Sequence, residues 1–131
     1  MDHSELVRAI RGRTDRHISC CQSVLLTFCA ETGLSEETAL ALGSPFGSGM
    51  HMGAVCGALT GGLMVLGLLG SDRQACAALT ARFRSRNNNY VNCRDLLRAA
   101  RDRGEERSSH CDRMVFEVVA DLDELLQREE P

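Results

Sequence analysis

Cysteine is the residue type whose number and spacing in this chain could support chemistry. Four of the seven cysteines begin the same pattern, in which the side chains three, four and seven positions further on are almost all apolar. Residues at these offsets share one face of an α-helix. The pattern therefore predicts four thiols that face a common interior, and these are the candidate catalytic residues: Cys21, Cys56, Cys93 and Cys111.

Thiols in such a position allow three interpretations. Cysteine thiolates are soft ligands, so the four could bind zinc or an iron–sulfur cluster, with His51 as an additional metal ligand. Two of them could instead form a reversible disulfide in a redox reaction. In the third interpretation all seven are core packing residues, as Cys20, Cys29 and Cys76 are expected to be, and the protein is a non-catalytic helical interaction module.

The elements that must position these thiols are predicted to be helices. Aromatic residues make up only 4% of the chain and tryptophan is absent, so the core must be filled by small and aliphatic side chains. Apolar periodicity, capping residues and the Asn87–Asn89 break predict an all-α bundle of about five helices. The first expected helix covers 4–31 and is stopped by Gly33, and a short helix 35–42 follows. A glycine-rich helix covers 50–69, and the next helix is capped by Ser71 and Asp72 and ends at Arg86. A short helix 93–103 follows Asn92, and the last helix runs from Ser108 or Ser109 to Gln127.

The glycine-rich segment 52–70 carries no charged residue. Such a segment can cross a membrane or form the buried centre of a helical bundle. The second interpretation is favoured, because the segment is short, contains six glycines and has no aromatic or basic flanks. Gly57 and Gly61 then allow close approach beside Cys56 and are the candidate cofactor-binding residues.

The order of the helices affects which thiols can meet. If the helices alternate in direction, Cys21 near the end of its helix and Cys56 and Cys93 near the start of theirs share one end of the bundle. Cys111 then begins its helix at the opposite end. The sequence thus predicts a site of three cysteines, which Cys111 joins only if the short helix before it crosses obliquely.

Composition limits the other function classes. The 131 residues fit one helical domain, 1–131. All 15 basic residues are arginine, which excludes a catalytic Schiff-base lysine, and the net charge of −3 argues against nucleic-acid binding. No secretory signal is visible, so a cytoplasmic location is expected. The odd number of thiols leaves one unpaired, which would suit a homodimer.

Four local sequences resemble a known family. They are Cys21 with the following Gln-Ser-Val-Leu, the central segment 53–62 around Cys56, Cys93 with its preceding Asn92, and Cys111 with the following Asp-Arg-Met-Val. Together they resemble the redox-active protein family named for the cysteine pattern C…GCAxxG…C…C. Two details differ from that pattern: Val55 precedes Cys56, and Gly57 separates Cys56 from Ala58. The resemblance implies a small helical protein with thiol redox or metal chemistry and an unidentified redox partner.

Overall fold

The computed structural model describes residues 2–129. These residues form eight α-helices, and the only extended pairing among them is an isolated antiparallel bridge between Val55 and Asn92. The predicted all-α class is therefore confirmed, whereas the number of helices is larger than expected. The α-helices are α1 Ser4–Arg11, α2 Cys20–Thr27, α3 Cys29–Thr32, α4 Glu36–Gly43, α5 Gly57–Leu68, α6 Arg73–Arg86, α7 Cys93–Asp102 and α8 Arg107–Glu129, with a 3₁₀ turn Ser44–Phe46 and a π-type turn Gly49–Gly53 before α5.

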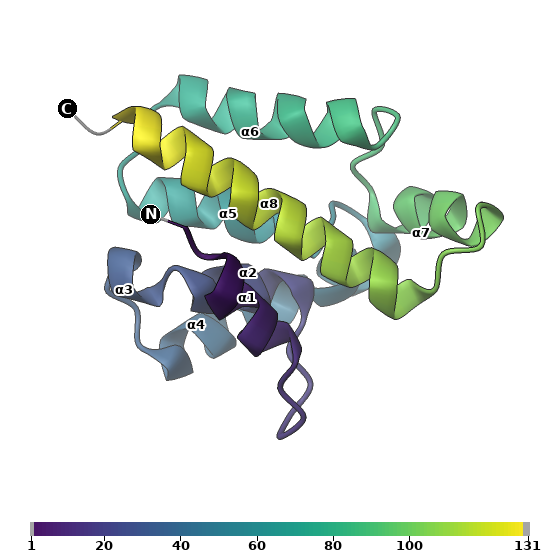
Figure 1. Ribbon diagram of the computed structural model, residues 1–131, viewed down its shortest axis with the longest axis horizontal. Helices are drawn as coiled ribbons and strands as arrows, with labels where there is room; N and C mark the ends of the chain where they lie inside the picture. Colours follow the sequence, from purple (N-terminus) through teal and green to yellow (C-terminus); the bar gives the residue numbers. More distant parts are fainter. Residues whose placement is uncertain (1, 130–131) are drawn as a thin grey trace.

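The single helix predicted for 4–31 is wrong. The chain leaves the helix at Gly12, crosses a loop and re-enters at Cys20, and Figure 1 shows this loop hanging below α1 and α2. The new start is fixed by a capping box, in which Ser19 accepts from the Gln22 N–H and the Gln22 side chain accepts from the Ser19 N–H. Cys20 is consequently the first residue of a helix and lies close to its positive end.

The helix predicted for 50–69 begins later than expected. Gly49, Met50 and His51 all have positive φ, and Cys56 is an extended N-cap, so the regular helix starts only at Gly57. The remaining 12 residues of α5 are packed by α2, α6 and α8, with buried glycines on two sides. No helix among the described residues has the length and apolarity needed to cross a membrane.

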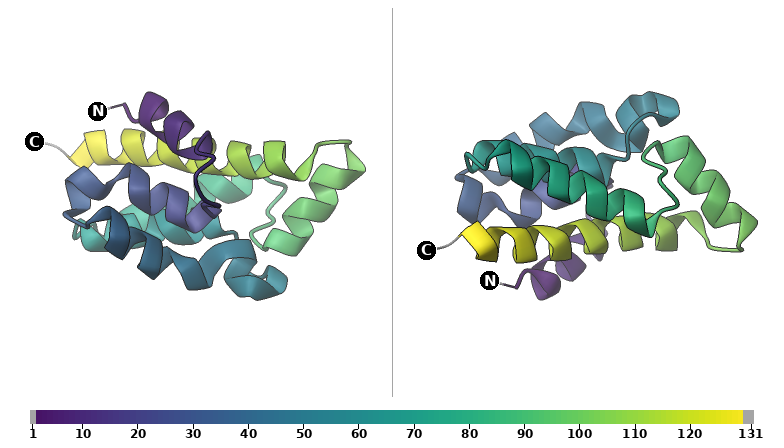
Figure 2. Two further views of the ribbon diagram at one scale, coloured as in Figure 1. Left: turned by 90° about the horizontal axis from the view of Figure 1, so that it is seen from below. Right: turned by 90° about the horizontal axis from the view of Figure 1, so that it is seen from above.

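Helix α8 organises the core. Its inner side is almost inaccessible to solvent and packs against α1, α2, α5 and α6; it comprises Met114, Val115, Val118, Val119 and Leu122. Figure 2 shows α8 along most of the length of the molecule, with α7 at one end beside the start of α8. This end is where α5 and α7 also begin (Figure 1). Several helix N-termini are therefore brought to one region.

Several local predictions are confirmed. Gly33 has φ 80° at the end of α3, and Ser35 caps α4 by accepting from the Thr38 N–H. Asp72 likewise caps α6. Asn88 and Asn89 have positive φ after α6, as expected for the residue type that tolerates left-handed backbone. These boundaries depend on residues adjacent in sequence, which explains why the pattern alone predicts them.

Candidate functional site

A cavity of about 520 Å³ lies among the starts of α2, α5, α7 and α8. Its volume is within the range typical of small-molecule sites. Four cysteines line it: Cys20, Cys56, Cys93 and Cys111. A wider depression of about 1030 Å³ beside α6 contains only Cys76 and so offers no second thiol. The smaller cavity is therefore the candidate site.

Each of the four cysteines belongs to the beginning of a helix. Cys20 and Cys93 are the first residues of α2 and α7, Cys56 is the N-cap of α5, and Cys111 is the fifth residue of α8. A helix N-terminus carries partial positive charge and unpaired N–H groups, which stabilise a thiolate. At Cys56 the backbone N–H groups of Ala58 and Leu59 act to lower the pKa of the thiol, although burial has the larger effect.

The isolated bridge holds two of the four cysteines in place. Cys56 N–H donates to the Val91 carbonyl at 2.8 Å, and Cys93 N–H donates to the Ala54 carbonyl at 2.7 Å. These bonds lie on either side of the Val55–Asn92 pair. Cys56 and Cys93 are therefore fixed relative to each other by backbone, although 36 positions separate them in the sequence.

Cys20 and Cys111 form the second pair. The Cys20 thiol donates to the Cys111 carbonyl oxygen at 3.9 Å. The neighbouring Cys20 thiol, followed by the positive charges of Arg107 and Arg11, lowers the pKa of Cys111 to about 6. The Cys111 side chain, together with burial, raises the pKa of Cys20 well above its usual value. One thiol of the pair thus ionises near neutral pH while its partner stays protonated.

The remaining thiols of the cavity resist ionisation. Burial raises the pKa of Cys56 to about 11, and the pKa of Cys93 is raised first by burial and then by the negative charge of Cys111. Because Cys111 also raises the pKa of Cys56, all four sulfurs lie within electrostatic reach of one another. Cys111 is thus the one cysteine of this cavity whose pKa is lowered.

Salt bridges hold the start of α8 against its neighbours. Arg11 donates from Nε to Asp112 at 2.7 Å, and its Nη1 donates to the Ile18 carbonyl and to Ser23. This guanidinium therefore joins α1 and α2 to the residue that follows Cys111. The relative position of Cys20 and Cys111 depends on this connection.

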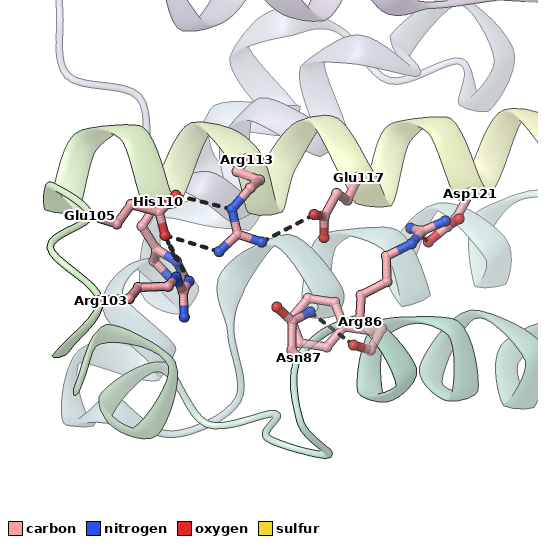
Figure 3. A network of polar contacts seen from close by, with 9 residues as sticks. Arg86, Asn87, Arg103, Glu105, His110, Arg113, Glu117 and Asp121 are labelled. Atoms are coloured by element: carbon pink, nitrogen blue, oxygen red, sulfur yellow. Dashed lines mark hydrogen bonds and ion pairs between the residues drawn. The ribbon is translucent and has the colours of Figure 1, made fainter. Parts of the chain in front are cut away.

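A second polar network supports α8 from the other side (Figure 3). Arg113 donates two hydrogen bonds to Glu105 and one to Glu117, and the pKa of Glu105 falls to about 2 chiefly because of Arg113. Further along α8, the buried Asp121 accepts from Arg86 of α6 at 2.5 Å. The two Arg113–Glu105 bonds join the α7–α8 turn to α8, and this turn places the start of α8, with Cys111, at the cavity.

Cys21 does not line the cavity. It is fully buried behind the site, its sulfur is 4.0 Å from that of Met64, and burial raises its pKa to about 12. The predicted cofactor residue Gly61 serves packing at the same place, since a Cβ on it would lie 3.0 Å from the Cys21 carbonyl oxygen. Gly57, in contrast, does line the cavity.

Two of the five predicted metal ligands, Cys21 and His51, lie outside the cavity that Cys56, Cys93 and Cys111 line. His51 is exposed, and its Nε2 lies 3.0 Å from the Ser44 carbonyl oxygen, away from the cavity lining. Within residues 2–129 no group of three or more His, Cys, Asp or Glu side chains is placed to hold a metal ion. The geometry thus provides two thiol pairs and no ready-made metal centre.

Sequence reasoning missed Cys20 as a residue of the cavity and assigned it to packing. The available signal was local: Ser19 and Gln22 have the spacing of a capping box, which places Cys20 at the first position of a helix. The apolar stripe instead selected Cys21, whose side chain points into the core. Apolar periodicity identifies the buried face of a helix, so it selects the fully buried Cys21 and not the neighbouring Cys20, which lines the cavity.

The lowered pKa of Cys111 predicts a distinct pH profile. A group with a depressed pKa loses its proton at lower pH, so the Cys111 thiolate should form as pH rises through about 6. Alkylation of Cys111 by iodoacetamide, followed by mass spectrometry of its peptide, is expected to accelerate with a midpoint near that pH. A midpoint above pH 8 would show that Cys20, Arg107 and Arg11 do not stabilise the thiolate.

Comparison with known proteins gives a match to one family model over most of the chain. The family model described as "Putative redox-active protein (C_GCAxxG_C_C)" matches residues 18–125, which include all four cavity cysteines. Neither the curated proteins nor the solved structures contain a significant match. The match covers most of the chain, and the protein therefore belongs to the C_GCAxxG_C_C family.

Proposed function

We propose that this protein catalyses thiol–disulfide exchange, with Cys111 as the attacking residue and Cys20 as the resolving residue. The observation that supports this most directly is that Cys20 and Cys111 line the same cavity in contact with each other, with the Cys20 thiol 3.9 Å from the Cys111 carbonyl oxygen. A thiol and a thiolate in contact have the composition of a reduced redox couple. The family assignment points in the same direction.

The proposed reaction has two steps. The Cys111 thiolate attacks one sulfur of a bound disulfide, the substrate S–S bond breaks, and the leaving thiolate takes the electron pair and then a proton. Cys20 then loses its proton and attacks the Cys111 sulfur, which forms an internal disulfide and releases the second substrate thiol. Overall two protein thiols are oxidised and one substrate disulfide is reduced to two thiols; the reverse sequence oxidises a substrate dithiol.

Cys56 and Cys93 are assigned a different part in this proposal. Their raised pKa values keep them protonated at neutral pH, so they do not compete with Cys111 for the substrate. They line the same cavity as the reacting pair without adding a second ionised sulfur. Cys21, Cys29 and Cys76 are outside the reaction.

Mapping of the oxidised protein tests the proposed couple. One equivalent of a disulfide oxidant, added to fully reduced protein under anaerobic conditions, is expected to lower the thiol count from seven to five and to link the Cys20 and Cys111 peptides. The Cys20→Ser variant should stop at a mixed disulfide on Cys111, visible as the added mass of half the oxidant. Seven unreactive thiols would support the packing interpretation instead. A stoichiometric zinc ion or iron–sulfur cluster that protects these cysteines would also contradict the proposal.

A further inference from the structure

The cavity is much more basic than the chain as a whole. Four arginines line it, whereas the only carboxylate in its lining is Asp112; the arginines are Arg11, Arg13, Arg16 and Arg107. The complete sequence has a net charge of −3. Positive charge is thus concentrated at the one place where the four cysteines meet, and a charged cleft attracts ligands of the opposite sign.

Two of the four arginines are already neutralised. Arg11 pairs with Asp112, and Arg13 pairs with Asp15 and with Glu36. Their positive charges are therefore satisfied within the protein. They shape the cavity and hold its elements together more than they attract a ligand.

The other two arginines have no carboxylate partner in the part of the chain that the structure describes. Arg107 makes one contact, to the Ser48 hydroxyl at 3.4 Å, and Arg16 forms no ion pair. Both side chains are exposed to solvent while also lining the cavity. A guanidinium presents parallel N–H groups that fit a carboxylate with two hydrogen bonds. The cavity lining therefore offers two carboxylate-binding groups without a carboxylate partner among the described residues, and one of them, Arg107, also acts electrostatically on Cys111.

From these contacts we infer that the substrate is a small disulfide that carries carboxylate groups, bound by Arg16 and Arg107 with its S–S bond toward Cys111. This inference rests on the proposed function, since it names the substrate class of the same site. The volume of about 520 Å³ accommodates one small molecule rather than a folded protein partner. The charge of the lining selects an anion among such molecules.

The anionic disulfide would react in the same two exchange steps. Cys111 sulfur bonds to one sulfur of the anionic disulfide, and the other half leaves as a thiolate that becomes protonated. Attack by Cys20 then breaks the mixed disulfide and releases the second half. Two electrons pass from the protein dithiol to the small disulfide, and the carboxylates stay unchanged as binding handles.

Two colorimetric disulfides, one anionic and one neutral, test the inference. 5,5′-Dithiobis(2-nitrobenzoate) carries a carboxylate on each half, whereas 4,4′-dithiodipyridine is neutral near pH 7. The measured quantity is the rate constant of the fast phase of thiol release, identified with Cys111 by its absence in Cys111→Ser. We expect Arg16→Ala to lower the rate constant for the anionic probe by about tenfold and to leave the neutral probe within about twofold.

A matched variant separates local binding from net charge. Arg98 is an exposed arginine of α7 that does not line the cavity and forms no ion pair with the described residues. Arg98→Ala removes the same charge as Arg16→Ala, and it should change neither rate constant by more than about twofold. Arg107→Ala is a second test, read at a pH above the Cys111 titration, because this arginine also stabilises the thiolate.

The outcomes distinguish the two proposals. Equal losses for both probes in Arg16→Ala, or equal losses in Arg16→Ala and Arg98→Ala, would overturn the carboxylate inference and leave thiol–disulfide exchange intact. Absence of a fast phase with the neutral probe in the unaltered protein would overturn the proposed function itself.

Discussion

Replacement of Cys111 with serine is expected to reduce the rate of reaction with a neutral disulfide at pH 7 by about 100-fold or more. The reason is the distribution of ionised sulfur in the cavity. Cys111 has a pKa of about 6 and is mostly thiolate at this pH, whereas the pKa values of Cys20, Cys56 and Cys93 are raised. An ordinary cysteine of pKa about 8.5 is only about 3% ionised at pH 7, and a raised pKa reduces that fraction further.

Stopped-flow absorbance with 4,4′-dithiodipyridine measures this effect. Cys76→Ser is the matched control, because Cys76 is half-buried on α6 and does not line the cavity, and it should react like the unaltered protein. Far-UV circular dichroism of both variants establishes that they are folded. A fast phase that survives in Cys111→Ser would assign the nucleophile to another cysteine.

Cys111 lines the same cavity as Cys20, Cys56 and Cys93, although helices that simply alternate in direction would place it at the other end of the bundle. Simple alternation places the start of the last helix at the far end, but α7 is only ten residues long and is followed by Gly104 with φ 79°. The chain turns there, and Arg113 with Glu105 fixes the turn against α8. The direction of such a short helix depends on salt bridges formed in the folded protein, and the apolar periodicity of the sequence does not predict these.

The break between α1 and α2 is a second feature that the apolar periodicity does not predict. Ile10, Ile18 and Cys21 all face the core, so the apolar pattern continues across a segment that is not helical. Local capping information at Ser19 marks the true start, and it is this start that moves Cys20 to the cavity. The sequence therefore predicts the helical class and most caps, whereas the identity of the converging sulfurs depends on where each helix begins in space.

Gly49→Ala is expected to be the most damaging glycine substitution at the site. Gly49 has φ 62°, and a Cβ added there would lie 2.3 Å from the Ala54 carbonyl oxygen, a distance that real Cβ atoms do not adopt. The clashing atom is a backbone oxygen, which cannot move away by a side-chain rotation. The same Ala54 carbonyl accepts a hydrogen bond from the Cys93 N–H. Relief of the clash must therefore shift the bridge that positions Cys56 and Cys93. We expect a loss of about 3 kcal/mol or more in the free energy of unfolding.

Gly70→Ala provides the control for backbone strain alone. Gly70 has φ 73°, close to that of Gly49, but nothing lies within 4 Å of an added Cβ. This variant should lose only the cost of an L-residue in left-handed backbone, about 1–2 kcal/mol. Urea denaturation followed by circular dichroism gives both values. Because both positions have a positive φ of similar size, the difference between them reports the contact with Ala54. Equal losses would mean that the loop before α5 can move without disturbing the thiol cavity.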